Sequence, residues 1–201
     1  MAELQLFPLR TVLFPDGLLD LRIFEARYLD LVSRCWRESA PFGVVALRSG
    51  SEARSGGDSV QLYETGTLAE LIDVDSAEAG ILAVRCRGGE RFRLVGAAHQ
   101  ERDGLWVAAT EPIAADPVVA PAPGHADIVQ ALADSIAALA AQGTRPFVEP
   151  HRLDSAGWVA DRWCEILPLP LEVRQRLLVL ADPLARLDLI ASLLRVRDSS
   201  N

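Results

Sequence analysis

Three cysteines and three histidines have side chains that could act as nucleophiles, general bases or metal ligands. These residues are Cys35, Cys86, Cys164, His99, His125 and His151. No two of them have the short spacing that is typical of a zinc site. Cys35 and Cys164 fall on apolar faces of predicted helices, where a thiol packs as a small hydrophobic group. We therefore expect no catalytic residue, no metal and no cofactor at these positions.

The basic residues exclude several further chemistries, because all 20 of them are arginine. A phosphate-binding P-loop needs a lysine on the β- and γ-phosphates. Schiff-base enzymes and Ser-Lys hydrolases need a lysine amine as well. The residue Ser155 precedes Ala156-Gly157 without the Gly-x-Ser-x-Gly pattern of a nucleophile elbow. These observations predict a protein that is not an enzyme.

Two charged patterns could bind a ligand instead. The most basic segment carries Arg85, Arg87, Arg91 and Arg93, which could hold a carboxylate or an RNA backbone. Cross-strand pairing with carboxylates is the favoured interpretation. Asp73 and Asp75 share one face of a predicted strand and could hold a hard cation, although a solvated face is the better interpretation. The net charge of −8 argues against nucleic acid as a partner.

These residues lie on two kinds of secondary structure. Up to about residue 113, alternating and short apolar runs predict strands over 5–7, 19–23, 42–47, 68–74, 81–87, 91–95 and 105–110. A Gly88-Gly89 turn is expected between two of them. One helix is expected over 24–37, with Phe24, Tyr28, Leu31 and Cys35 on one face. The Gly- and Ser-rich segment 48–59 is expected to be a mobile loop. This pattern suggests a barrel or a sandwich.

After a Pro-rich linker at about 114–125, the hydrophobic period becomes that of helices. A first helix carries an apolar stripe and stops near Gly143, a second is capped by Asp154 or Ser155, a third covers 171–180, and a fourth begins at Asp182-Pro183. Trp158 and Trp163 are five residues apart and therefore lie on different faces. We expect one in the core and the other, with Phe147, exposed to a partner.

The segment 6–32, LFPLRTVLFPDGLLDLRIFEARYLDLV, combines two Phe-Pro pairs, a Pro-Asp-Gly turn, an alternating strand and the start of a helix. Proline removes a backbone donor and therefore suits strand ends and edges, while Asp-Gly supplies turn chemistry. Phe7, Phe14 and Phe24 are expected to anchor the sheet to its helix. A folding signature is the main interpretation, since such residues usually lie in cores.

This segment closely resembles the start of the Lon N-terminal (substrate-binding) domain family of ATP-dependent proteases, and in particular its stand-alone bacterial members. The segments GTLAELIDVD at 66–75, GERFRLV at 89–95 and the helical segment 166–194 extend the resemblance over nearly the whole chain. The resemblance implies an α+β protein with two domains. A PUA-like β pseudo-barrel with one packed helix would occupy 1–115, and a C-terminal helical bundle would occupy 116–201.

The resemblance also implies a function, namely non-enzymatic recognition of protein or peptide clients, without the ATPase and peptidase parts of Lon. The alternative is an RNA- or nucleotide-binding PUA-like module. Because the family motif concentrates there, we expect Phe14, Glu25 and Arg27 to contact a partner. The competing interpretation is that Phe14 is buried and the two charges merely pair.

Hydropathy and cysteine content predict the compartment. No apolar run is long enough to span a bilayer, and no signal peptide is evident. Three widely spaced cysteines are typical of a reducing compartment. We therefore expect a cytoplasmic protein with no membrane partner.

Overall fold

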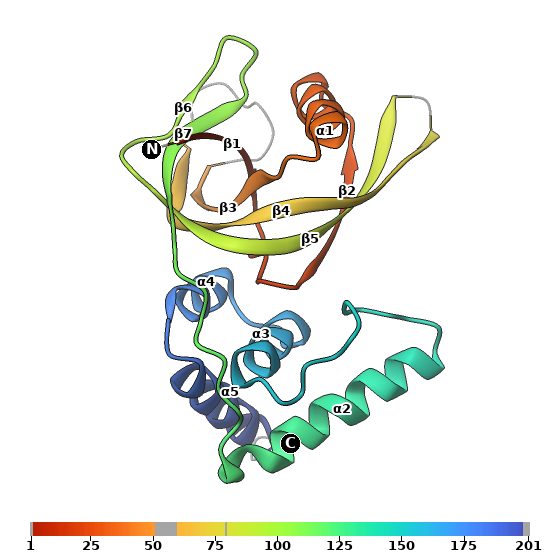
Figure 1. The fold of residues 1–201 in the computed structure, drawn as a ribbon, viewed down its shortest axis with the longest axis vertical. Helices are drawn as coiled ribbons and strands as arrows, with labels where there is room; N and C mark the ends of the chain where they lie inside the picture. Colours follow the sequence, from red (N-terminus) through yellow and green to blue (C-terminus); the bar gives the residue numbers. More distant parts are fainter. Residues whose placement is uncertain (1, 51–59, 79, 199–201) are drawn as a thin grey trace. The chain divides into compact units, whose positions relative to one another are not determined.

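The chain has a mixed sheet and helices, and so belongs to the α+β class (Figure 1). The computed structural model describes residues 2–50, 60–78 and 80–198. It divides into two compact units, Met1–Ala114 and Ala115–Asn201. The expected domains 1–115 and 116–201 stay a prediction, because compactness does not show that either part folds alone.

The first unit is built on a seven-stranded sheet with the order β2-β5-β4-β3-β1-β7-β6. Its strands are β1 (Ala2–Leu9), β2 (Leu18–Ile23), β3 (Phe42–Ser49), β4 (Gln61–Glu78), β5 (Ile81–Leu94), β6 (His99–Gln100) and β7 (Trp106–Pro112). β1 and β3 are parallel, and the other pairs are antiparallel. An additional pairing of β5 with β7 curls the sheet back on itself.

The longest strands differ from the sequence prediction. The expected strands 81–87 and 91–95 form the single strand β5, so the expected turn at Gly88-Gly89 is wrong. Gly88 is required for a different reason, since a Cβ there would overlap the carbonyl oxygen of Phe14. The pair of glycines therefore marks a close approach of two backbones inside a sheet rather than a reversal of the chain.

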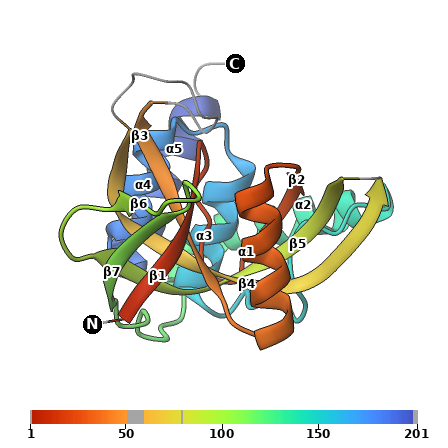
Figure 2. The same cartoon turned by 90° about the horizontal axis from the view of Figure 1, so that it is seen from above.

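The helix α1 (Ala26–Glu38) covers one face of the sheet (Figure 2). Its apolar stripe includes Tyr28, Leu31 and Cys35, which lie in one core cluster with side chains of β1 to β5. Phe7 from β1 stacks on Tyr28 with ring centroids 3.9 Å apart. The helix begins two residues later than predicted, and Phe24 is 69% exposed. The expectation that Phe24 anchors the helix is therefore wrong.

The second unit contains four α-helices within its described residues, namely α2 (Ala126–Ala141), α3 (Ala156–Ile166), α4 (Leu171–Val179) and α5 (Pro183–Asp198). A short 3₁₀ helix, η1 (Pro123–His125), precedes them. The Ser155 hydroxyl accepts a hydrogen bond from the Trp158 amide at 3.5 Å and caps α3. Asp182 caps α5 by accepting from the amides of Leu184 and Ala185. Both caps agree with the sequence prediction.

The expected linker, 114–125, is fastened to the second unit over part of its length. The Val119 carbonyl accepts a hydrogen bond from the Ala156 amide at 2.9 Å, at the start of α3. The Asp116 carboxylate binds Arg186 of α5 at 2.7 Å. The predicted mobile loop lies mostly in 51–59, outside the described residues.

Candidate binding sites

Phe14, the first residue predicted to contact a partner, has no exposed surface. Its carbonyl accepts a hydrogen bond from the Gly17 amide at 2.9 Å, which closes the Pro-Asp-Gly turn. Two further bonds of 2.8 Å fasten this turn to β5, one from the Asp16 amide to the Gly88 carbonyl and one from the Gly88 amide to the Gly17 carbonyl. Phe14 is buried, in agreement with the competing interpretation, because the turn is held against the sheet by backbone bonds that the local sequence does not reveal.

Arg27, another residue predicted to contact a partner, is also buried. Its guanidinium donates to the Gly104 carbonyl at 2.8 Å and pairs with Glu25 at 2.7 Å. It also lies 4.6 Å from the centroid of the Tyr28 ring. Arg27 thus ties the start of α1 to the turn before β7. Partner binding at this corner stays a prediction, and of the three named residues only Glu25 is partly exposed there.

The arginines of β5 are committed to carboxylates or buried. Arg85 binds Asp20 at 2.7 Å, Arg87 binds Asp16, and Arg93 binds Glu111 at 3.2 Å. Arg91 is buried and donates to the Ala114 carbonyl at 3.3 Å. The predicted cross-strand pairing is therefore confirmed, and the row does not present a uniform positive surface to a phosphate backbone.

The cysteines are free and buried. Burial raises the pKa of Cys35 and Cys164, and it raises the pKa of Cys86 to about 12. These thiols are therefore protonated at neutral pH and poor nucleophiles. Among the described residues, no group of three or more Cys, His, Asp or Glu side chains is arranged to hold a metal ion.

A groove of about 490 Å³ lies beside the C-terminal end of α1. Its lining comes from three segments, and the residues are Cys35, Trp36, Ser39, Ala40, Pro41, Glu70 and Leu71. Trp36 is 49% exposed, although an indole usually gains free energy from burial. Trp36 was not predicted as a site residue, because its helical position lies beside the apolar stripe and not within it.

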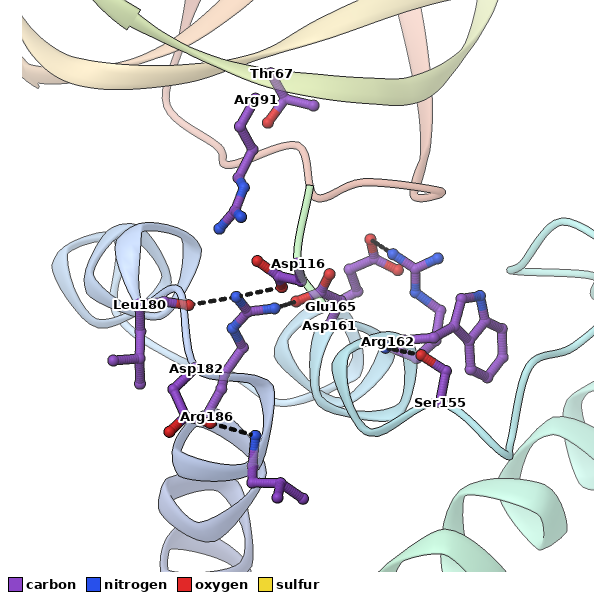
Figure 3. Close-up of polar contacts among 12 residues, drawn as sticks. Thr67, Arg91, Asp116, Ser155, Asp161, Arg162, Glu165, Leu180, Asp182 and Arg186 are labelled. Carbon is purple, nitrogen blue, oxygen red and sulfur yellow. Dashed lines mark hydrogen bonds and ion pairs between the residues drawn. The ribbon is translucent and has the colours of Figure 1, made fainter. Parts of the chain in front are cut away.

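The second unit contains a cluster of buried charges on α3, α5 and the segment before η1 (Figure 3). Arg186 is 1% exposed and binds Asp161 at 2.8 Å and Asp116 at 2.7 Å, and it also donates to the Leu180 carbonyl. Arg162 has no exposed surface and binds Glu165 at 2.8 Å. The bonds of Arg186 join α5 to α3 and to the segment before η1, whereas the pair of Arg162 with Glu165 lies within α3. All of these contacts are structural in character.

Burial changes the pKa of the two acids of α3, Asp161 and Glu165, more than ion pairing does. It raises the pKa of Asp161 to about 6, although Arg186 and Arg162 oppose the shift. It also raises the pKa of Glu165, again against the effect of Arg162. Two acids with raised pKa values could suggest a proton-transfer site, but each carboxylate is already bound by an arginine side chain, Asp161 by Arg186 and Glu165 by Arg162.

The two tryptophans of α3 are both buried, and so is Phe147, so the expected exposed aromatic surface is wrong. Phe147 and His151 precede the helix and fold over Trp158, with ring centroids 6.0 Å and 5.8 Å away. On another face, the indole of Trp163 donates to the Ile128 carbonyl of α2 at 3.1 Å. The two faces are thus covered by different segments.

A family model described as the ATP-dependent protease La (LON) substrate-binding domain matches residues 3–196. No curated protein matches the chain. A solved structure from Xanthomonas campestris, described as a Lon N-terminal domain protein, is 31% identical, with 96% of this chain and 98% of that chain covered and a TM-score of 0.76. The N-terminal domain of Mycobacterium avium complex Lon protease is 14% identical with a TM-score of 0.62, covering 95% of this chain and 97% of that one, and supports the fold alone.

No helix within the described residues has the length and apolarity needed to cross a membrane.

Proposed function

Because the chain belongs to the family of Lon substrate-binding domains, we propose that it is a non-enzymatic module that binds polypeptide clients. The observation that carries the proposal is the match over residues 3–196, which accounts for both units. The exposed Trp36 beside a groove supports it, because an aromatic side chain at a concave surface is a common anchor for a protein partner.

We further propose that the first unit is a PUA-like pseudo-barrel and the second a helical bundle. The pairing of β5 with β7, which brings distant strands together, supports the first assignment. The pairing of α3 with α2 through Trp163 and with α5 through Asp161 supports the second. The unpaired cysteines support a reducing compartment such as the cytoplasm.

The ion pairs made by the arginines of β5 argue against the alternative function, RNA or nucleotide binding. Arg85, Arg87 and Arg93 of β5 are bound to carboxylates, and the whole chain has a net charge of −8. Phosphate neutralisation supplies most of the affinity for nucleic acid, and these arginines are already paired with carboxylates of the chain.

The test is a fluorescence anisotropy titration with reduced, carboxymethylated α-lactalbumin, which is permanently unfolded. We expect saturable binding to the unfolded form and none to native α-lactalbumin, with no cleavage of casein and no ATP turnover. Single-stranded RNA provides the competing ligand. Binding of RNA without binding of the unfolded protein, or turnover by the pure protein, would overturn the proposal.

A further inference from the structure

The strand β4 has an open edge over its second half. Its first half, residues 61–69, pairs with β3 on one side, while β5 pairs with the other side along nearly the full length. From Glu70 to Ser76 no described residue pairs with the side opposite β5. A row of backbone donors and acceptors is therefore available for another strand.

The reason why β3 stops is local. The register places Phe42 opposite Ala69, so the next antiparallel pair would join Pro41 to Glu70. Proline has no amide hydrogen and cannot extend the ladder. Ser39, two residues before Pro41, has a φ of 51°, which turns the chain as α1 ends. The groove beside Trp36 lies at this point, where β4 loses its neighbour.

The side chains along this edge differ between its two faces. A register shift between Leu71 and Asp73 lets both Leu71 and Val74 pack against the core under α1. Asp73 and Asp75 flank Val74 and therefore point to the opposite face, where both are exposed. The face toward α1 thus offers the exposed indole of Trp36, and the other face offers carboxylates.

The charges decide which strand fits. Arg85 and Arg87 lie opposite Asp73 and Glu70 across the ladder and attract them, but these two arginines are also bound to Asp20 and Asp16. The carboxylates around this edge therefore outnumber the arginines, and the edge keeps a net negative charge. A second copy pairing through the same edge would bring these carboxylates together, which is unfavourable. An extended segment with apolar side chains on one face and basic side chains on the other matches both surfaces.

We propose that the edge of β4 from Glu70 to Ser76 captures an extended client segment as an added strand, with an apolar side chain in the groove against Trp36 and basic side chains opposite Asp73 and Asp75. The inference rests on the proposed function and adds to it the position, the backbone geometry and the chemistry of the client.

The first experiment uses a fluorescein-labelled eight-residue peptide that alternates valine and arginine. Two matched peptides carry N-methyl groups on all valines or on all arginines. Residues that alternate along a strand present their amides to opposite edges, so only one of these two peptides loses the bonds to β4. We expect that one to bind at least tenfold more weakly and the other to retain most of its affinity. Equal binding of all three peptides would overturn the proposal.

The second experiment uses variants of the whole chain. We expect Trp36→Ala to weaken peptide binding about tenfold, the order of effect seen for an anchor residue. The double variant Asp73→Asn and Asp75→Asn should weaken it about fivefold at low salt and less at high salt. Glu64→Gln is the matched control, since this exposed residue lies in the half of β4 that β3 covers. It should bind the peptide within twofold of the wild type.

Amide hydrogen exchange locates the bound segment and separates the possible outcomes. Slower exchange at 70–76 on adding the peptide is expected. If carboxymethylated α-lactalbumin binds while exchange at 70–76 and the variants show no effect, this inference fails and the proposed function stands. If neither ligand binds, both fail. Protection of 70–76 that rises with protein concentration alone, without peptide, would assign the edge to a second copy and would also overturn the inference.

Discussion

Replacing Gly88 with alanine should destabilise the first unit strongly, because of where a single methyl group would lie. A Cβ at this position would overlap the Phe14 carbonyl oxygen and would approach the Phe14 carbonyl carbon to 3.0 Å and Leu13 Cγ to 3.2 Å. The two nearest obstacles are backbone atoms, which cannot rotate away. The turn that holds Phe14 must therefore move off β5.

The expected cost follows from the contacts that this movement disturbs. Overpacking in a tightly packed region costs about 1–3 kcal/mol. The Asp16 amide and the Gly88 amide would also lose or lengthen their hydrogen bonds of 2.8 Å to the opposite backbone, each worth about 1 kcal/mol. We expect the free energy of unfolding to fall by about 3 kcal/mol, which corresponds to a decrease in Tm of roughly 10 °C for a chain of this size.

The neighbouring glycine supplies the matched control. A Cβ at Gly89 would meet the Glu70 carboxylate oxygen at 2.8 Å, at the far end of a flexible side chain, and the Leu68 carbonyl at an ordinary 3.5 Å. Urea unfolding followed by far-ultraviolet circular dichroism should show Gly89→Ala within about 1 kcal/mol of the wild type, as for most changes without a core defect. If Gly88→Ala is as stable as Gly89→Ala, the opening segment is not the scaffold that these contacts indicate.

Three further predictions concern buried side chains. Trp163→Ala should lower the free energy of unfolding by about 3–5 kcal/mol in urea titrations, because it leaves a large cavity and removes the hydrogen bond to the Ile128 carbonyl. A loss below about 1 kcal/mol would contradict the observed burial. The raised pKa of Asp161, about 6 against an ordinary 3.8, means that the folded state binds its proton more tightly than the unfolded state. The stability that this shift contributes is present below about pH 4 and is lost as the pH rises through about 6. The free energy of unfolding of Asp161→Asn should therefore decrease less than that of the wild type between these two pH values. Equal dependence of the unfolding free energy on pH in the two proteins would refute the shift. The buried thiols should not react with Ellman's reagent at pH 8 until urea is added, whereas fast labelling of the native protein would show that a cysteine is accessible.

Local chemistry in the sequence was enough to predict the division of secondary structure and the family. The caps at Ser155 and Asp182 act on amides two or three residues away, so the starts of α3 and α5 could be read from the chain directly. The alternation of apolar residues placed the strands for the same reason, since side-chain direction in a strand has a period of two. The opening segment was correctly interpreted as a folding signature, because Phe14 is buried in the structure.

The candidate site depended on contacts between residues far apart in the chain, which no local pattern reveals. Arg27 is held in a buried position by its bond to the Gly104 carbonyl, 77 positions away in the chain. Trp158 and Trp163 lie on different helix faces, yet both are buried, because Phe147 covers one and α2 covers the other. The open edge of β4 follows from the pairing register that would set Pro41 opposite Glu70, and a register between strands is a property of the folded sheet. Propensity and capping act within a few residues, whereas burial and strand pairing arise only when distant segments meet, and so the tertiary structure alone decided which aromatic and charged side chains remain available to a partner.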